Sequence, residues 1–209
     1  MPAPDLSGMI KKNVEDLKRL QQRVLPVKVG QAITASIKEN FRKGGFYNEE
    51  RWSDPLRKKL GFRGADGSYG PLLSGNDHLM NATDYVPLPG RIIIRNLVHY
   101  ASVHNDGDQI AVTERMKNFF WGKHRDAKEL YGKGSPEADF WRNMALKKPG
   151  SRIKIPRRRF MAKNAVVLKM ADDIINAELR KYIDTHYGCE WLSFFLSLTS
   201  SQHLSTRSM

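Results

Sequence analysis

Residues 152–182 read RIKIPRRRFMAKNAVVLKMADDIINAELRKY, which joins a strand signal to a helix signal. The first four residues alternate charged and apolar side chains, as a half-exposed strand does. Farther on, apolar residues recur at spacings of three and four, which predicts an amphipathic helix from about Arg159 to Thr185.

The strand at 152–155 needs a partner, and residues 109–113 are the best candidate. Between these two segments, residues 114–148 show helical spacing, interrupted by the turn-rich YGKGSPE. We therefore expect a hairpin with a long helical insert. The β-branched run RIIIRN at 91–96 predicts a further strand that is buried on at least one face.

Two amphipathic helices are predicted at the N-terminus. The first covers Met9 to Leu25 and is expected to stop at Pro26, whereas the second runs from about Lys28 to the Gly44-Gly45 pair. Residues 45–72 are rich in turn formers and predict a long loop.

Within that loop, Trp52 and Leu56 are expected to act as apolar anchors, with Trp52 in a packing role. Two short elements should follow the loop. One is a helix over 75–83 capped by Asn76 or Asp77, and the other is a helix or turn that ends at Gly107.

The expected fold class is thus α+β, with a small antiparallel sheet packed against amphipathic N- and C-terminal helices. We expect one domain over residues 1–187, with the insert at about 114–148. The segment 188–209 contains WLSFFLSL and a Ser/Thr-rich end, and it is expected to be weakly ordered. The apolar segment is too short to span a bilayer, and no other run approaches the ~20 residues required.

Charge is concentrated in one part of the chain. The 209 residues have a formal net charge of +13, and residues 140–171 contain ten basic and no acidic side chains. Such a patch can attract either phosphate groups or an acidic protein surface, and composition does not separate these two partners. The alternative is a solvated face that only keeps the protein soluble. We expect the partner or DNA surface to comprise Arg152, Lys154, Arg157, Arg158 and Arg159.

None of the familiar catalytic or metal-binding patterns is present in the sequence. His99 and His104 are five residues apart, which does not place them on one helix face, and no HExxH or Cys-x-x-Cys accompanies them. Cys189 is the only cysteine, and Ser74 does not lie in a G-x-S-x-G elbow. We predict no enzyme activity, no cofactor and no bound metal.

Four local patterns occur in a fixed order: WSDPL, LLSGNDHLMNAT, VHYASVHNDG and IPRRRFM before the last helix. Together they resemble the tailed-phage virion morphogenesis family, the Mu-like tail completion proteins. The likeness covers about residues 24–184. The motif positions that carry it are Trp52, Leu73, Gly75, Tyr100, Ala101, His104, Gly107, Pro156, Arg158 and Phe160.

The resemblance implies a structural protein that completes the tail and supports head-tail joining. Its implied partners are other tail or neck proteins, a homo-oligomeric ring of its own copies, and packaged DNA. Its implied location is the virion, or the host cytoplasm during assembly. The alternative is a basic nucleic-acid-binding accessory protein of the virion or packaging apparatus.

Overall fold

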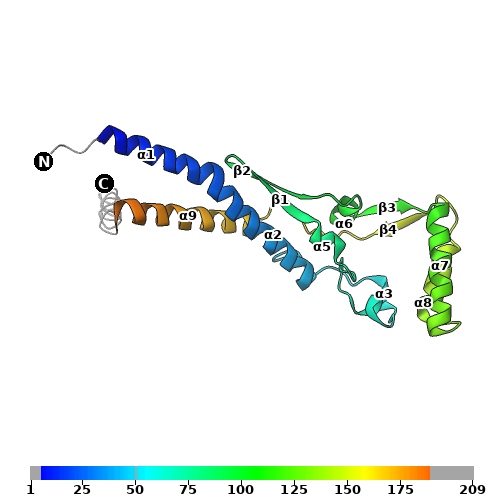
Figure 1. The fold of residues 1–209 in the computed structure, drawn as a ribbon. Coiled ribbons are helices and arrows are strands. Elements are labelled where there is room, and N and C mark those ends of the chain that lie inside the picture. Colours follow the sequence, from blue (N-terminus) through cyan, green and yellow to red (C-terminus); the bar gives the residue numbers. More distant parts are fainter. Residues whose placement is uncertain (1–5, 50, 189–209) are drawn as a thin grey trace, which may run out of the picture. The chain divides into compact units, whose positions relative to one another are not determined.

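The computed structural model describes residues 6–49 and 51–188 of the chain (Figure 1). It is mostly helical and contains two antiparallel sheets of two strands each, β1-β2 and β3-β4. The α+β class predicted from the sequence is confirmed.

The elements follow the chain in a simple order. The helices are α1 (Leu6–Arg19), the π-helix η1 (Leu20–Val24), α2 (Leu25–Lys43), α3 (Leu56–Lys59), α4 (Ala65–Ser68), α5 (His78–Asn81), α6 (Ala101–Asp106), α7 (Glu114–Tyr131), α8 (Pro136–Ala145) and α9 (Ala165–Tyr187). The strands are β1 (Thr83–Leu88), β2 (Arg91–Asn96), β3 (Asp108–Ala111) and β4 (Arg152–Ile155).

The chain divides into two compact units that interleave in the sequence. Within the described residues, one unit contains 6–29, 87–92 and 165–188, and the other contains 30–49, 51–86 and 93–164. The expected single domain over 1–187 stays a prediction. The expected tail lies outside the described residues, except for Gly188.

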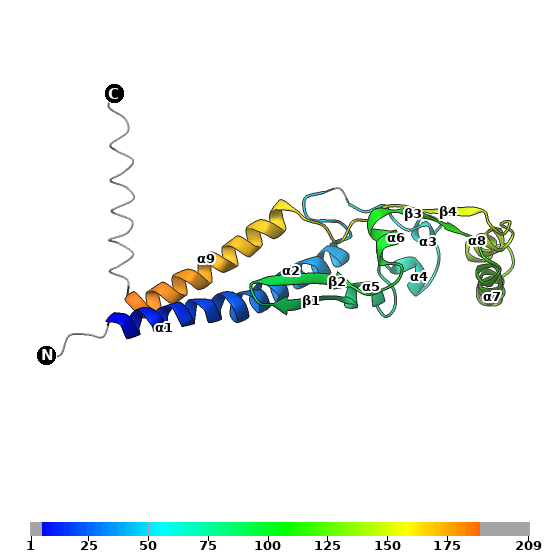
Figure 2. The same cartoon turned by 90° about the horizontal axis from the view of Figure 1, so that it is seen from above.

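In the first unit, α1 and α9 lie side by side (Figures 1 and 2). Asn13 and Asp16 of α1 contact the C-terminal end of α9, whereas Lys28, farther along the chain, pairs with Glu178 near its middle. The two helical segments are therefore antiparallel. Their polar contacts include Asn13 Nδ2 to Tyr187 Oη at 2.7 Å, Tyr182 Oη to the Asn13 carbonyl at 3.3 Å, and His186 Nε2 to Asp16 Oδ2 at 3.8 Å.

The prediction that Pro26 ends the first helix is wrong. Proline lacks an N–H and crowds the carbonyl four residues earlier, so it normally breaks a helix. Here the five residues of η1 precede it, and the Leu25 N–H donates to the Leu20 carbonyl with π-helix spacing. The wider turn accommodates Pro26 in the first turn of α2, and the chain stays helical from Leu6 to Lys43.

The hairpin with a long insert is confirmed in the second unit. β3 and β4 pair antiparallel, with Gln109 opposite Lys154 and Ala111 opposite Arg152. Between them the chain forms α7 and α8, which lie at the far end of the two-stranded ribbon (Figure 1). Thr113 caps α7 by accepting from the Met116 N–H, and Ser135 caps α8 by accepting from the Ala138 N–H.

Several local expectations differ from the structure. The predicted loop at 45–72 contains α3 and α4, and Leu56 is 61% exposed, so it is not an anchor. The helix expected over 75–83 is limited to α5, and Asp77 precedes it without a side-chain cap because its carboxylate accepts from the Ser74 N–H.

The strand β1 was not predicted, because Pro87 lies inside it and disguises its pattern. The strand expected at 91–96 is present as β2. It is only half-buried on one face, and Ile93 is exposed.

A buried aromatic cluster forms the core of the second unit. Phe41 of α2 packs against Trp52 and Phe160, with ring centroids 5.7 and 5.0 Å apart. Phe41 and Phe160 are almost fully buried, and Trp52 is 8% exposed. The predicted packing role of Trp52 is confirmed.

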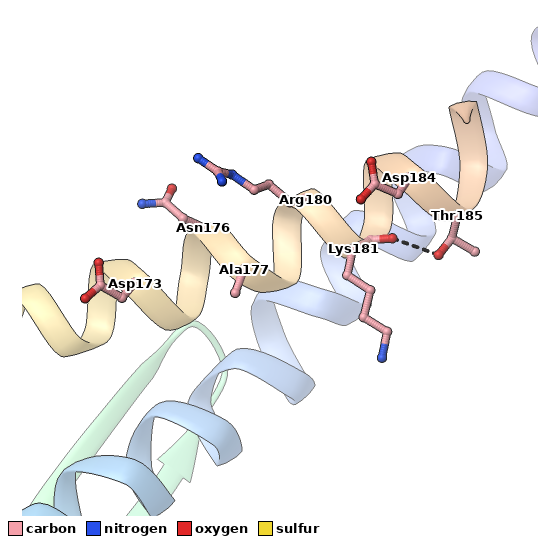
Figure 3. A pocket seen from close by; sticks show the side chains of 7 residues that line it. All are labelled: Asp173, Asn176, Ala177, Arg180, Lys181, Asp184 and Thr185. Carbon is pink, nitrogen blue, oxygen red and sulfur yellow. Dashed lines mark hydrogen bonds between the residues drawn. The ribbon is translucent and has the colours of Figure 1, made fainter. Parts of the chain in front are cut away.

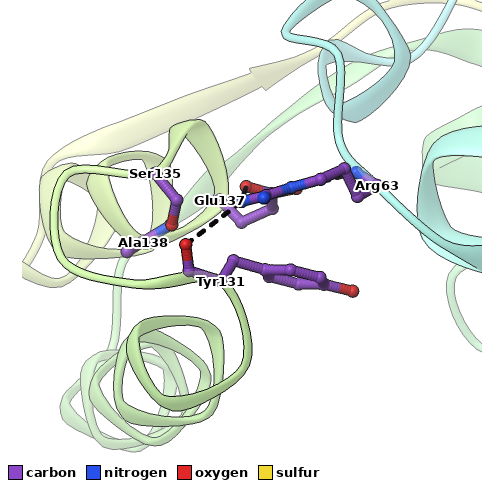
Figure 4. A network of polar contacts seen from close by, with 5 residues as sticks. All are labelled: Arg63, Tyr131, Ser135, Glu137 and Ala138. Carbon is purple, nitrogen blue, oxygen red and sulfur yellow. Dashed lines mark hydrogen bonds and ion pairs between the residues drawn. The ribbon is translucent and has the colours of Figure 1, made fainter.

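A second polar and aromatic network fastens the loop before α4 to the helical insert (Figure 4). The buried Glu137 carboxylate accepts from the Arg63 backbone N–H at 2.7 Å and from its side-chain Nε and Nη2, both at 3.2 Å. The Arg63 guanidinium also lies 4.4 Å from the centre of the Tyr131 ring. The bonds from Arg63 lower the pKa of Glu137 to about 2.

This shift predicts an acid-sensitive contribution to stability. Because the folded pKa of Glu137 lies below the ordinary value of 4.5, its stabilisation is present above that value and is lost as pH falls toward about 2. The urea midpoint of Glu137→Gln should therefore fall less between pH 6 and pH 3 than that of the wild type. Asp139→Asn, an exposed change in the same helical turn, serves as the control. Equal falls in the wild type and Glu137→Gln would contradict the assignment.

Candidate functional site

Residues 156–161, between β4 and α9, bring the sequence motifs together. The Arg158 N–H donates to the His104 carbonyl at 2.8 Å, and the Phe160 and Met161 N–H groups both donate to Asn105 Oδ1, at 3.0 and 2.9 Å. The segment is thereby fastened along α6. Helix α6 ends at Gly107, as the sequence predicted.

Arg158 is buried, which corrects its assignment to an outward surface. Its side chain is directed into the second unit, where Nε and Nη2 donate to the Ser53 carbonyl at 3.2 and 3.1 Å. Only 7% of the residue is exposed. Burial and the nearby Arg57 cation lower the pKa of Arg158, and the bonds to Ser53 offset part of the cost of burying the charge.

Trp52 and Arg159 also join residues 156–161 to the loop that contains Ser53. Trp52 Nε1 donates to the Arg159 carbonyl at 3.0 Å, while Arg159 Nη1 lies 3.2 Å from Glu49 Oε1. Arg159 is half-buried, and the Glu49 carboxylate offsets its charge. Two of the three consecutive arginines therefore bind residues of the 49–53 loop, and Arg157 is the exposed one.

His104 lies beside these contacts, because its carbonyl accepts from the Arg158 N–H. Burial lowers the pKa of His104, and the Arg158 cation lowers it further. The lowered pKa favours the neutral ring over a second positive charge beside Arg158. The Nδ1 of His104 is buried without a hydrogen-bond partner among the described residues, and the ring packs edge-on against Tyr100 at 5.8 Å.

The other motif residues contribute less to the cluster. Ala101 is buried in α6, and Pro156 is exposed. Leu73 is half-buried, and its carbonyl accepts from Arg57 Nη2 at 3.1 Å. Gly75 lies on an exposed turn near the Tyr69 hydroxyl. The Leu73 and Gly75 motif shapes a separate loop of the second unit.

Asn105 and Ser53 are the structurally important residues that the sequence did not reveal. Asn105 accepts two backbone hydrogen bonds from the Phe160 segment, and the Ser53 main chain accepts both bonds from Arg158. The only available signal for Asn105 was its place just before the Asp-Gly pair that ends α6. For Ser53 no signal existed, because its carbonyl would act the same way with any side chain.

Of the five basic residues predicted to form the partner or DNA surface, the exposed ones lie on the β3-β4 ribbon and just beyond it. Arg152 and Lys154 alternate with half-buried isoleucines on β4, and Arg157 follows. Together with residues of β3, the three basic residues line a groove of about 420 Å³. Asp106 and Asp108 line the same groove, which therefore carries charges of both signs.

No group of three or more His, Cys, Asp or Glu side chains is placed to hold a metal ion within residues 6–49 and 51–188. Over the same ranges, no helix combines the length and apolar composition needed to cross a bilayer. Cys189 lies outside the described residues.

No protein-family model matches the chain, and no curated protein or solved structure matches it. The likeness to virion morphogenesis proteins thus rests on the four motifs alone.

Substitution of Gly107 tests whether its close approach to Arg157 contributes to stability. Its φ of 76° is rarely adopted by other residues, and an added Cβ would lie 3.0 Å from the Arg157 backbone nitrogen. We expect Gly107→Ala to lower the free energy of unfolding by about 1–3 kcal/mol, measured by urea denaturation.

Gly132→Ala is the matched control. Gly132 also follows a helix with a positive φ, of 90°, but no neighbouring atom lies within 4 Å of its added Cβ. The amount by which Gly107→Ala lowers the free energy of unfolding more than Gly132→Ala does measures the effect of the contact with Arg157. Equal losses in the two variants would show that this contact does not constrain the chain.

Proposed function

We propose that the chain is a non-enzymatic phage assembly protein that completes the tail and supports head-tail joining. It acts in the virion and is present in the host cytoplasm during assembly. Its partners are other tail or neck proteins and further copies of itself in a ring. Contact with packaged DNA is a secondary role.

The observation that carries the proposal is the convergence of distant motif residues. Trp52, His104, Gly107, Arg158 and Phe160 lie up to 108 positions apart in the sequence, yet they meet in one packed cluster. Each contributes to packing, to a backbone bond or to a tight turn. A motif series with this kind of role is typical of a shared fold, which supports the family resemblance and a structural function.

The mixed charges of the ribbon groove favour a protein partner. Arg152, Lys154 and Arg157 are exposed together, and Asp106 and Asp108 lie in the same groove. A surface with both signs can set the orientation of a complementary protein, whereas a phosphate backbone would be repelled by the two carboxylates. An assembly protein needs such an orienting surface where it meets its neighbour.

Nucleic-acid binding is the second candidate because the ribbon exposes three cations close together. Fewer cations are available to DNA than the high charge of residues 140–171 suggests, since Arg158 is buried and Arg159 is paired with Glu49. If the three exposed cations contacted duplex DNA, the logarithm of affinity would fall with the logarithm of salt with a slope of about −3.

Charge reversal on the ribbon tests the proposal in a phage whose genome encodes this chain. We expect the triple variant Arg152→Glu, Lys154→Glu and Arg157→Glu to fold, because all three side chains are exposed. It should not restore infectivity to a phage lacking the protein, and electron microscopy should show tailless heads beside free tails. The control variant reverses the charges of Lys11, Lys12 and Lys18, which are exposed on α1, and so changes the net charge by the same amount.

The same variants distinguish the two candidates in a DNA titration at two salt concentrations. For the assembly protein we expect duplex DNA binding no tighter than about 1 µM at physiological salt. Tighter binding that the ribbon triple abolishes and the α1 triple preserves would favour the nucleic-acid candidate. Normal particles from the ribbon triple would contradict a joining role for this surface.

A further inference from the structure

Helix α9 has one side fastened to its own unit and another side exposed. Glu178, Tyr182 and His186 are four residues apart and contact Lys28, Asn13 and Asp16 respectively, so they mark the inner side. No residue of this 23-residue helix is buried. The exposed side is thus available to another helix.

A shallow groove of about 620 Å³ runs along the exposed side (Figure 3). Among the residues that the structure describes, its lining comes from α9, and most of these lining residues are charged. The charged lining residues are Asp173, Arg180, Lys181 and Asp184, and the small Ala177 lies between them. Ala177 also lines an adjoining groove of about 460 Å³ that contains the apolar Val166, Met170 and Ile174.

Several charged residues on the two sides of Ala177 have opposite signs and lie at similar distances from it. Asp173 lies four residues before it and Lys181 four residues after it. Farther out, Lys169 lies eight residues before it and Asp184 seven residues after it. For these two pairs an acid on one side corresponds to a base at nearly the same distance on the other side, whereas Arg180, three residues after Ala177, has the apolar Ile174 at its mirror position.

This pattern complements itself only when two copies of the helix run antiparallel. A two-fold axis at Ala177 places Asp173 of one copy opposite Lys181 of the other, and places Lys169 near Asp184, with each pairing occurring twice. In a parallel, in-register pair, each charged residue would instead lie opposite the same residue of the other copy, and the like charges would repel each other. The small Ala177 side chain at the centre allows the two helix axes to approach closely.

We propose that the exposed side of α9 binds the same side of a second copy, antiparallel and centred on Ala177, to form a symmetric dimer. The apolar residues Val166, Met170 and Ile174 adjoin the centre and lose exposure in the dimer. This contact is two-fold and closed, so it is distinct from the repeating contacts that would build a ring. It rests on α9 alone and does not depend on the proposed role in phage assembly.

Charge reversal with mixing tests the dimer on the full chain. Sedimentation velocity should give a wild-type mass of twice the 23.9 kDa chain. Asp173→Lys and Lys181→Asp should each dimerise at least tenfold more weakly, because each places like charges opposite each other twice. An equimolar mixture of the two variants should recover the dimer, since the lysine introduced in one copy then meets the aspartate introduced in the other.

Asp172→Lys is the matched control, because it makes the same charge change on the neighbouring exposed residue, on another side of the helix. It should leave the dimer unchanged, and circular dichroism should show all variants folded. A wild-type chain that stays monomeric at about 100 µM would overturn the proposal. A dimer that is insensitive to both single reversals, or is not recovered on mixing, would also overturn it.

Discussion

The second unit depends on the burial of Arg158. A buried guanidinium is costly unless acceptors surround it, and here the Ser53 carbonyl accepts from both Nε and Nη2. The backbone of the same residue is bound to His104, so one residue joins the loop after Trp52 to helix α6. The neighbouring Phe160 then enters the aromatic cluster with Phe41 and Trp52. Burial of the ring, the cation and the main-chain bonds holds residues 156–161 in place within the second unit.

Much of the fold could be predicted from local periodicity. The pairing of β3 with β4 across 40 intervening residues was predictable because the charged and apolar residues of 152–155 alternate, and because the insert has its own helical spacing. The continuity of α1 through α2 was not predictable, because a π-helix before Pro26 offsets a residue that normally ends helices. Strand β1 was missed since Pro87 hides its pattern, and the polar network of Arg63 and Glu137 carries no short-range signal.

The candidate site was predicted in part. The sequence placed Trp52 in a packing role and Gly107 at a helix end, because aromatic and glycine residues have recognisable local preferences. The sequence could not separate Arg158 from Arg157, since neighbouring arginines look alike until tertiary packing buries one of them. The concentrated positive charge thus has two roles. Arg158 holds the unit together, and the exposed side chains of the ribbon form the surface proposed to meet a partner.

Amide hydrogen exchange at residues 158–161 of the full chain tests the central role of this segment most directly. The Arg158, Phe160 and Met161 N–H groups donate to His104 and Asn105, whereas an exposed basic loop would leave them open to water. We predict strong protection of all three amides, and loss of protection at Phe160 and Met161 when Asn105→Ala removes their acceptor. Exchange of these amides in the wild type at the rate of an unstructured peptide would contradict a buried, structural Arg158 segment.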